Sequence, residues 1–486
     1  MASTSRIPAI ALCALLAWSS VAQAFNPQPP EMVSRLQGTG QPANVYCGAP
    51  RFDASNRFLA FTCDGFLVGG DANSHYDTFL LDRATGVIEL ISLSSAGQQV
   101  NYHSGGGIPS IDGNEVVFSS AGPLHPDFGV PPGYPSSRAA IYLRHRDSGQ
   151  TELISRDLFG SSLFWSALFY DANLPRREVL FTYDRDIRVP PPYLPAPGDH
   201  LWIRNWETGA VELISNKPDG TNSGGGAYSA KFSADGRYVF FVNGADDLGP
   251  PARVGDDNIY VRDRQTGSIE RLTYPWQGGE FQAPPPFQFY MSGGFRISAD
   301  GRFVVFSSSS RELHPDPETL SGTRLYLLDR QTGEVEHLSS TPGYSSFNAH
   351  ADISDDGRYV AWASRNFTFQ GPANPLPSTR ALWVLDRHTG QRVNVAESLG
   401  PLHGDTGISL ELSGDGSMIA FTWRLANPAQ PNYFPERLYT VDLRGPQPYV
   451  APQPVPTTTD KRTLLGIAAL LLLFGLRRLR RRKHVR

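Results

Sequence analysis

Short runs of β-branched, aromatic and aliphatic residues recur along the chain, and tight-turn sequences separate them. Residues 295–340 show the pattern most clearly, with Ala-Asp-Gly-Arg at 299–302 and Asp-Arg-Gln-Thr-Gly at 329–333. Asp-Gly and Thr-Gly sequences between such runs are typical of β-hairpins. The pattern predicts four short strands, at 296–298, 303–307, 324–328 and 334–339.

The same four-strand pattern appears seven times, in copies that span 49–92, 109–155, 167–215, 230–273, 295–340, 351–397 and 409–443. The third copy has lost its Asp-Gly turn to residues 173–176. The turn aspartates of the later copies are expected to be turn residues and not acid–base pairs, and they are Asp235, Asp300, Asp356 and Asp415. One small sheet cannot bury both of its faces, so neighbouring copies must stack.

The two ends of the repeat array predict how it closes. The seventh copy lacks a fourth strand, whereas residues 31–37 form a spare strand that precedes the first copy. Pairing the spare strand with the last copy leaves no open sheet edge. We therefore predict an all-β fold, a seven-bladed β-propeller closed by its N-terminal strand.

Long insertions are confined to one set of connections. Turns between first and second strands and between third and fourth strands are short throughout. The long segments are second-to-third loops and blade-to-blade connections, at 121–138, 184–198, 274–294, 308–322, 364–379 and 424–436. In an up-and-down blade these connections share one face, and loops on a rigid scaffold commonly carry binding residues. We expect the functional surface on this long-loop face.

Both chain ends predict export. Arg6, the apolar run 7–18 and Ala-Gln-Ala at 22–24 indicate a signal peptide over residues 1–24, cleaved between Ala24 and Phe25. The propeller is expected at 25–444, followed by a Pro-rich linker at 445–462. A short hydrophobic helix and an Arg-rich tail follow at 463–486. The tail would stay cytoplasmic, and the helix would tether the chain to the inner membrane.

The C-terminal end resembles bacterial sorting signals of the IPTL-CTERM and PEP-CTERM kind, although Val-Pro-Thr-Thr stands at 455–458 and no Pro-Glu-Pro occurs. A plain tail anchor is the alternative. The repeat itself, with sequences such as Phe-Ser-Ala-Asp-Gly-Arg-Tyr-Val-Phe-Phe at 232–241, resembles the TolB-like propeller repeat PD40 of secreted bacterial proteins. That resemblance implies a propeller, and for function it implies interaction modules, enzyme adjuncts and a few lyases.

The charge of the chain is unevenly distributed. Without Arg6 and the nine basic residues of the segment 461–486, 33 basic residues remain against 47 acidic ones, a formal charge of about −14. An acidic surface disfavours binding to the phosphates of nucleic acid. We expect a monomeric propeller at the cell surface or in the periplasm that binds no nucleic acid.

Cys47 and Cys63 are the cysteines that remain after cleavage. If Phe52 lies opposite Phe58 in the first hairpin, the two cysteines also face each other, within disulfide range. Export favours a disulfide, and two free thiols are the alternative.

Aromatic and proline residues are concentrated in two of the long loops. They are Trp276, Phe281, Phe287, Phe289 and Tyr290 in the segment 274–294, and Tyr193 after three prolines in the segment 184–198. Such loops provide stiff, partly apolar surfaces for a protein, peptide or glycan. The alternative is a self-packed lid over the central channel.

Two further groups of residues suggest metal chemistry. Asp71, Asn73 and Asp77 offer oxygen ligands for Ca²⁺, although the loop is not an EF-hand and its side chains could simply cap their own turns. Histidines form the second group: His125 and His314 in repeated Leu-His-Pro-Asp sequences, and His103, His350 and His403 at blade entrances. Propellers similar to oligogalacturonate lyases place metal-binding histidines around such an axis, but no motif of that family matches here.

These observations predict an exported binding protein, with a protein or peptide partner at the long-loop face, rather than an enzyme. No Gly-x-Ser-x-Gly or His-Glu-x-x-His sequence occurs. Two alternatives stay open: a metal-dependent polysaccharide lyase or hydrolase that uses rim histidines, and a Ca²⁺-stabilised structural protein of the matrix. No cofactor other than Ca²⁺ is expected.

Overall fold

The computed structural model describes residues 25–128, 139–161, 167–188, 195–245, 247–249, 257–279, 291–310, 312–315, 323–338, 350–366, 379–399, 408–424 and 435–444. The predicted signal peptide, the linker and the C-terminal hydrophobic helix with its basic tail lie outside these residues. Within the described part, no helix is long and apolar enough to cross a membrane.

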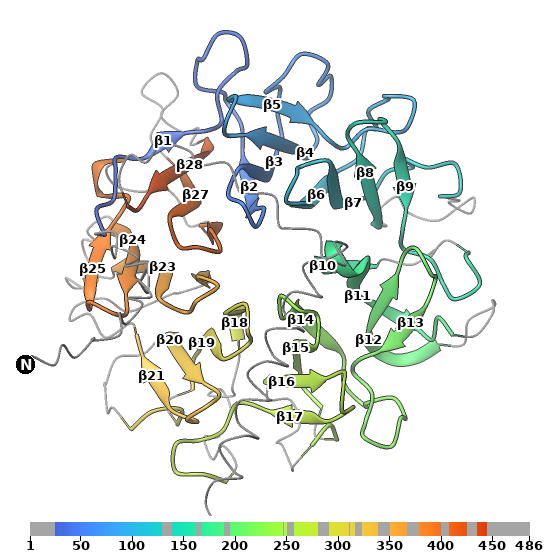
Figure 1. Ribbon diagram of the computed structural model, residues 1–486, viewed down its shortest axis with the longest axis vertical. Helices are drawn as coiled ribbons and strands as arrows, with labels where there is room; N and C mark the ends of the chain where they lie inside the picture. The colour runs from blue at the N-terminus through green and yellow to red at the C-terminus, as the bar shows by residue number, and fades with distance from the viewer. Residues whose placement is uncertain are drawn as a thin grey trace, which may run out of the picture. The chain divides into compact units, whose positions relative to one another are not determined.

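Seven four-stranded antiparallel sheets surround a common axis, as predicted (Figure 1). Blades 1 to 3 are β2 (Cys47–Phe52), β3 (Phe58–Cys63), β4 (Asp77–Asp82) and β5 (Val87–Leu90); β6 (Ser104–Pro109), β7 (Glu115–Ser120), β8 (Ala140–His145) and β9 (Thr151–Leu153); and β10 (Leu168–Asn173), β11 (Glu178–Arg185), β12 (Pro195–Asn205) and β13 (Val211–Leu213). Blades 4 and 5 are β14 (Ala227–Phe232), β15 (Tyr238–Asn243), β16 (Asn258–Asp263) and β17 (Ile269–Arg271); and β18 (Met291–Ile297), β19 (Phe303–Ser308), β20 (Arg324–Asp329) and β21 (Val335–His337). Blade 6 is β22 (Ala351–Ile353), β23 (Tyr359–Asn366), β24 (Thr379–Asp386) and β25 (Gln391–Asn394). Two 3₁₀ helices, η1 (Leu174–Arg176) and η2 (Glu397–Leu399), complete the elements outside blade 7.

The N-terminus closes the ring in blade 7. Its sheet has the order β1 (Glu31–Met32), β28 (Glu436–Asp442), β27 (Met418–Arg424) and β26 (Leu410–Leu412), so the earliest strand is the outermost one. The closing strand is shorter than the predicted 31–37. After Val33, whose N–H still donates to Leu438 O, the chain turns back on itself, and Leu36 N donates to Gln41 O.

The repeated turn sequence has a structural role in several blades. In blade 5, Asp300 accepts hydrogen bonds from Ser298 Oγ (2.6 Å) and from Arg302 N (2.9 Å). The guanidinium of Arg302 forms a bidentate pair with Asp329 at the end of β20 (2.9 and 2.6 Å). The same pairs recur as Arg57–Asp82, Arg237–Asp263 and Arg358–Asp386. The turn aspartates therefore cap turns, as the sequence indicated.

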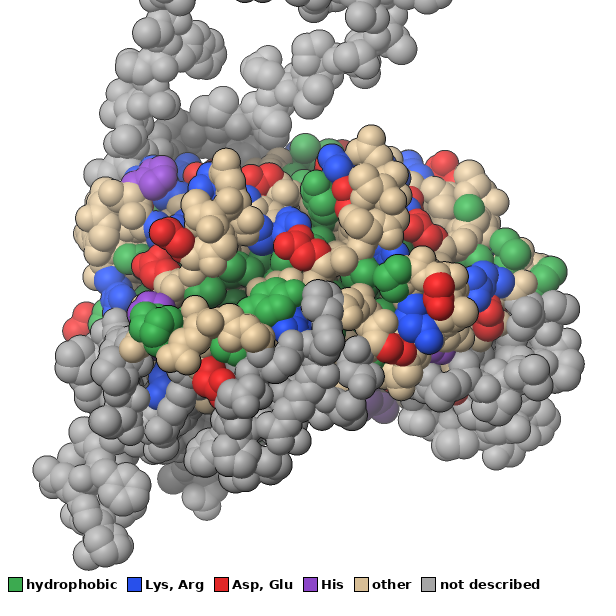
Figure 2. All heavy atoms as spheres, turned by 90° about the horizontal axis from the view of Figure 1, so that it is seen from below, with side chains coloured by type: hydrophobic (Ala, Val, Ile, Leu, Met, Phe, Trp, Pro, Cys, Tyr) green, Lys and Arg blue, Asp and Glu red, His purple; other side chains and the backbone are tan. Residues whose placement is uncertain are grey.

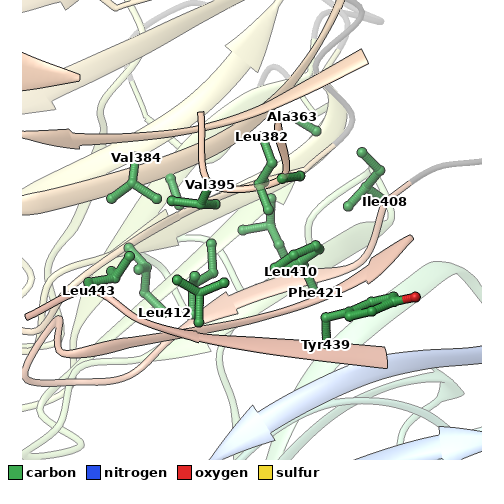
Figure 3. Packing of buried hydrophobic residues seen from close by; sticks show 14 of the residues in the cluster. Ala363, Leu382, Val384, Val395, Ile408, Leu410, Leu412, Phe421, Tyr439 and Leu443 are labelled. Atoms are coloured by element: carbon green, nitrogen blue, oxygen red, sulfur yellow. The ribbon is translucent and has the colours of Figure 1, made fainter. Parts of the chain in front are cut away.

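The hydrophobic core lies between the blades, in seven clusters of buried residues. Figure 3 shows the cluster in which Leu382 and Val384 of blade 6 face Leu410 and Phe421 of blade 7. Because each sheet buries one face against each neighbour, the central strands are almost continuously apolar and fully buried, as in the phenylalanine-rich β15. Burial of this kind fixes the blades as rigid supports for the residues at their edges.

Cys47 and Cys63 lie opposite each other in the β2–β3 ladder and form a disulfide. The pairing that led to this expectation was wrong in part, because Phe52 pairs with Leu59 and not with Phe58. A β-bulge between Gly48 and Arg51 accommodates the difference, and Ala49 adopts a left-handed backbone conformation there (φ 47°). The bulge restores the register that joins the two cysteines.

We expect the double variant Cys47→Ala/Cys63→Ala to unfold more easily than the wild type. The two residues are 16 apart in sequence, and closing a loop of this length contributes about 3 kcal/mol to the free energy of unfolding. Urea unfolding of both proteins measures the difference. The wild type in reducing agent should match the variant, and equal midpoints for oxidised wild type and variant would contradict the prediction.

Candidate functional site

The aromatic residues predicted to bind a partner can be assessed only at the start of their loop. Phe281, Phe287, Phe289, Tyr290 and Tyr193 lie outside the described residues. Trp276 is described, and its side chain is 53% exposed. Its backbone N–H donates to Glu312 O of blade 5 (2.7 Å), which holds the segment after β17 against the next blade. Trp276 is therefore an exposed aromatic residue on a fixed backbone.

Trp276 lines a groove between blades 4 and 5 with a volume of about 740 Å³. One wall is the segment that leaves β17, which includes Tyr274 and Pro275, and the opposite wall is formed by Leu328 and Val335 of blade 5. The Arg271 guanidinium lies 4.2 Å from the centre of the Tyr274 ring. Residues of β17 and β21 line the groove, and in Figure 1 both strands lie at the periphery of the ring. Figure 2 views this side, where hydrophobic side chains lie between acidic and basic ones.

Arginines close the equivalent junctions between other blades. Arg262 of blade 4 donates to the backbone carbonyls of Ile214 (3.1 and 3.2 Å) and Asn216, which follow the outer strand of blade 3, and to Gly267 O (2.7 Å). Arg144 of blade 2 contacts the chain that leaves blade 1 in the same way. It donates to Leu93 O, Ser94 O and Gly149 O. Each guanidinium thus joins one blade to the segment that follows the outer strand of the preceding blade.

Leu328 takes the place of this arginine in blade 5. Leu328 precedes its turn glycine, Gly333, by five residues, the same spacing as that between Arg262 and Gly267. A leucine cannot donate hydrogen bonds, and the junction between blades 4 and 5 is open. Leu81 occupies this position in blade 1, and it lines a second groove of about 360 Å³ between blades 7 and 1. The second groove contains the chain's own cations, Arg35 and Arg83.

The groove between blades 4 and 5 contains more acidic than basic groups. Glu270, Glu334 and Glu336 line it, together with Arg271 and Arg330. Arg330 pairs with Glu270 at 3.3 Å and donates to Gly301 O at 2.9 Å. Glu334 and Glu336 are exposed, and within the described residues neither forms a close ion pair, although the charge of Glu336 acts on Arg392 of blade 6. The site combines aromatic surface with negative charge.

The loop proposed for Ca²⁺ is held by its own hydrogen bonds. Asn73 donates to Val100 O (2.9 Å), and its side-chain oxygen accepts from His75 N (2.8 Å). The side-chain amide of Gln99 donates to both Asp71 (2.9 Å) and Asp77 (2.6 Å). Burial raises the pKa of Asp77 to about 6. The oxygens of Asp71 and Asp77 thus come together around an amide nitrogen, whereas Asn73 caps its own turn.

The predicted histidines are distributed over separate places. His103 Nδ1 accepts from Tyr76 N (3.0 Å), and the His103 ring lies 4.9 Å from that of His75. His125 Nδ1 accepts from the N–H of Asp127 within its own turn (3.1 Å). His314 lines the groove between blades 4 and 5, and His403 lies outside the described residues. Across the described ranges, no three His, Cys, Asp or Glu side chains are grouped to hold a metal ion.

Charged residues, which the sequence analysis did not identify, surround the propeller axis. One residue occupies the same ladder position in each innermost strand, and these residues are Arg51, Ile108, Asp171, Lys231, Arg296, Asp352 and Glu411. The six charged members line a cavity of about 260 Å³. In blades 1 to 5 a bulge in the innermost strand precedes the residue at this position, with left-handed backbone at positions such as Ala49 and Ser229.

Three ion pairs join neighbouring blades in this axial cluster. Arg51 binds both oxygens of Glu411 (2.9 and 3.1 Å). The Lys231 ammonium lies 3.5 Å from Asp171, and Arg296 Nε lies 3.6 Å from Asp352. Because the cluster has three cations and three carboxylates, it is formally neutral when all six are ionised.

Burial opposes ionisation in the axial cluster. Burial, and then the neighbouring Glu411, raise the pKa of Asp352 to about 7. Burial and the positive charge of Arg51 lower the pKa of Lys231 to about 8. His350 lines a neighbouring cavity with Arg51 and Arg296, and burial lowers its pKa to about 4, so it is neutral at pH 7.

No protein-family model matches the sequence, and no curated protein matches it. Solved structures are similar in fold. The oligogalacturonate lyase of Vibrio parahaemolyticus has a TM-score of 0.50 and 13% identity, over 88% of this chain and 100% of that chain. An oligogalacturonate lyase in complex with manganese has a TM-score of 0.47 and 14% identity, over 87% and 98%. A putative TolB from Agrobacterium tumefaciens has a TM-score of 0.37 and 17% identity, over 61% and 81%. At these identities the similarity shows the propeller fold alone.

Proposed function

We propose that this protein is an exported β-propeller that binds a protein or peptide segment in the groove between blades 4 and 5. The observation that carries the proposal is a groove of about 740 Å³ with the exposed Trp276 and Tyr274 on its wall. Rigid aromatic side chains next to apolar and acidic groups are typical of protein interfaces. The Pro- and aromatic-rich segment 274–294 begins at this wall, so the groove lies at the start of the longest insertion.

Export and tethering belong to the same proposal. The buried Cys47–Cys63 disulfide is consistent with folding in an oxidising compartment. The segment 1–24 would direct the chain across the inner membrane, and the segment 463–486 would tether or sort it there with the basic tail in the cytoplasm. Repeats similar to the TolB-like PD40 kind fit a secreted interaction module.

Peptide selection tests the binding proposal. A displayed library of random peptides is selected on the mature full-length protein in detergent, and the dissociation constants of the recovered peptides are measured. We expect the double variant Tyr274→Ala/Trp276→Ala to bind them at least about tenfold more weakly, because truncating an interface aromatic commonly costs 2 kcal/mol or more.

Phe159→Ala is the matched control. Phe159 is as exposed as Trp276 (55%) but lies in the turn that leaves blade 2, so its loss should not change the dissociation constants. If no peptide is retained, or if the groove variant binds every peptide as tightly as the wild type, the proposed function is wrong.

A further inference from the structure

We propose that the groove between blades 4 and 5 receives the side chain of an arginine that the bound segment carries. This inference rests on the proposed function, and it specifies the chemistry of the partner. The guanidinium would occupy the position that Arg262 and Arg144 fill from within the chain at other junctions. The partner would thus supply the guanidinium that blades 2 and 4 supply from within this chain.

We call the place between two blades that such a guanidinium occupies the arginine slot. The junction between blades 3 and 4 shows which groups this slot offers to a guanidinium. Arg262 is 94% buried, and its guanidinium donates to carbonyl oxygens one and three residues beyond β13, those of Ile214 and Asn216. It also donates to Asn216 Oδ1 (2.8 Å) and to Gly267 O in the turn of its own blade (2.7 Å). The acceptors approach the guanidinium from two blades. A planar group with five donors satisfies such a set, whereas a single ammonium cannot do so with the same geometry.

The same acceptors are present between blades 4 and 5. Leu272 and Tyr274 follow β17 by one and three residues, as Ile214 and Asn216 follow β13, and Gly333 corresponds to Gly267. Within the described part of the chain, no hydrogen-bond donor reaches the carbonyl oxygens of Leu272, Tyr274 or Gly333. All three residues line the groove. The junction between blades 4 and 5 therefore has the carbonyl acceptors of the slot but no arginine among the described residues that donates to them, because Leu328 stands at the arginine position.

Charge and aromatic surface favour a cation in this slot. Glu334 and Glu336 line the groove in addition to the carbonyl oxygens. The exposed ring of Trp276 offers a face for cation–π contact, whereas the Tyr274 ring already contacts the Arg271 guanidinium. Arg330 is already bound to Glu270 and to Gly301 O, so it does not supply the missing donor. The formal charge of about −13 over residues 25–444, from 33 basic and 46 acidic residues, also attracts a basic segment.

The groove between blades 7 and 1 provides an internal comparison. It also has leucine, Leu81, at the arginine position, but Arg35 and Arg83 line it. Arg35 donates to Gly40 O (3.0 Å) and Met32 O (3.2 Å) within the same segment. Because cations already line this groove, the inference does not extend to it.

Peptides selected on the wild-type protein provide the test. Each arginine in a bound peptide is replaced in turn by citrulline, which has nearly the same shape but no charge. We expect one position at which this change weakens binding at least about tenfold, because the neutral side chain loses the charge that strengthens its hydrogen bonds to the carbonyl oxygens. The variant Leu328→Arg, which places a guanidinium in the slot in cis, should weaken binding to a similar extent, whereas Leu328→Met should not.

The possible failures are distinguishable. Peptides that require Trp276 but bind equally well with citrulline at every position would overturn the arginine slot and leave the proposed function standing. Full binding to a folded Leu328→Arg protein, with an unchanged melting temperature, would also overturn the slot. A protein that retains no peptide at this groove would overturn both.

Discussion

The variant Asp352→Asn is expected to gain stability relative to the wild type as the pH rises from 5 to 8, by about 2–3 kcal/mol. The axial cavity raises the pKa of Asp352 to about 7, whereas an aspartate in an unfolded chain titrates near 4. The folded state therefore binds more protons than the unfolded state between these values. Stability is highest while Asp352 is protonated in the folded state, and it falls as the pH rises towards 7. Asparagine removes this dependence and keeps an oxygen for Leu412 N, which donates to Asp352 at 2.6 Å.

Urea midpoints of both proteins between pH 5 and pH 8 measure this effect. Asp219→Asn is the control, because hydrogen bonds from Thr221 lower the pKa of Asp219 and keep it ionised over the whole range. The urea midpoint of the control should change with pH as steeply as that of the wild type. Parallel curves for Asp352→Asn and wild type would mean that Arg296 and Arg51 hold Asp352 ionised in the folded state.

The variant Arg262→Leu is expected to lose about 4 kcal/mol of unfolding free energy, because several acceptors lose a charged donor at once. Arg262 is buried and binds Ile214 O, Asn216 and Gly267 O, so its loss separates blade 3 from blade 4 at the circumference. The variant reproduces between these blades the arrangement that Leu328 creates between blades 4 and 5. Thermal and urea unfolding measure the loss.

Arg262→Lys should lie between the two proteins, since an ammonium keeps the charge but not the fork of donors. Arg188→Leu is the control for the loss of an arginine as such. Arg188 pairs with Asp186 at 2.7 Å on the surface, and exposed pairs of this kind contribute about 1 kcal/mol or less. A loss for Arg262→Leu no larger than for Arg188→Leu would show that the junction does not depend on the guanidinium.

The repeat made most of the fold predictable. Seven copies of a four-strand pattern, a last copy without its outer strand and a spare strand at the start allow one closed ring, and the structure has this ring. The role of the turn aspartates was equally predictable, because Asp300 and its equivalents form hydrogen bonds with residues that lie within five positions of them in the sequence. The length of the closing strand could not be predicted, because Glu31 and Met32 pair with residues about 400 positions away in the sequence.

The Cys47–Cys63 pairing shows how a correct outcome can rest on an incomplete argument. Simple hairpin symmetry placed Phe52 opposite Phe58, whereas the bulge at Ala49 shifts one half of the ladder and leaves the other half in register. Period-2 alternation gives no sign of a bulge at an alanine. The register near the turn was therefore mispredicted, although the cysteines were paired correctly.

The sequence alone determined the number of blades and the closure of the ring, because these follow from hydrophobic periodicity and turn residues that act locally. The confinement of long loops to one face stays a prediction, because most of these loops lie outside the described residues. Only the tertiary structure decided what the blades enclose. Arg51 and Glu411 meet at the axis across 360 residues, and the leucine at position 328 matters because the carbonyls of Leu272 and Tyr274 lie beside it. The arginine of copies 2 and 4 and the leucine of copies 1 and 5 are visible in the repeat. The structural effect of the arginine or leucine depends on contacts with the preceding blade, and these contacts cannot be predicted from one copy alone.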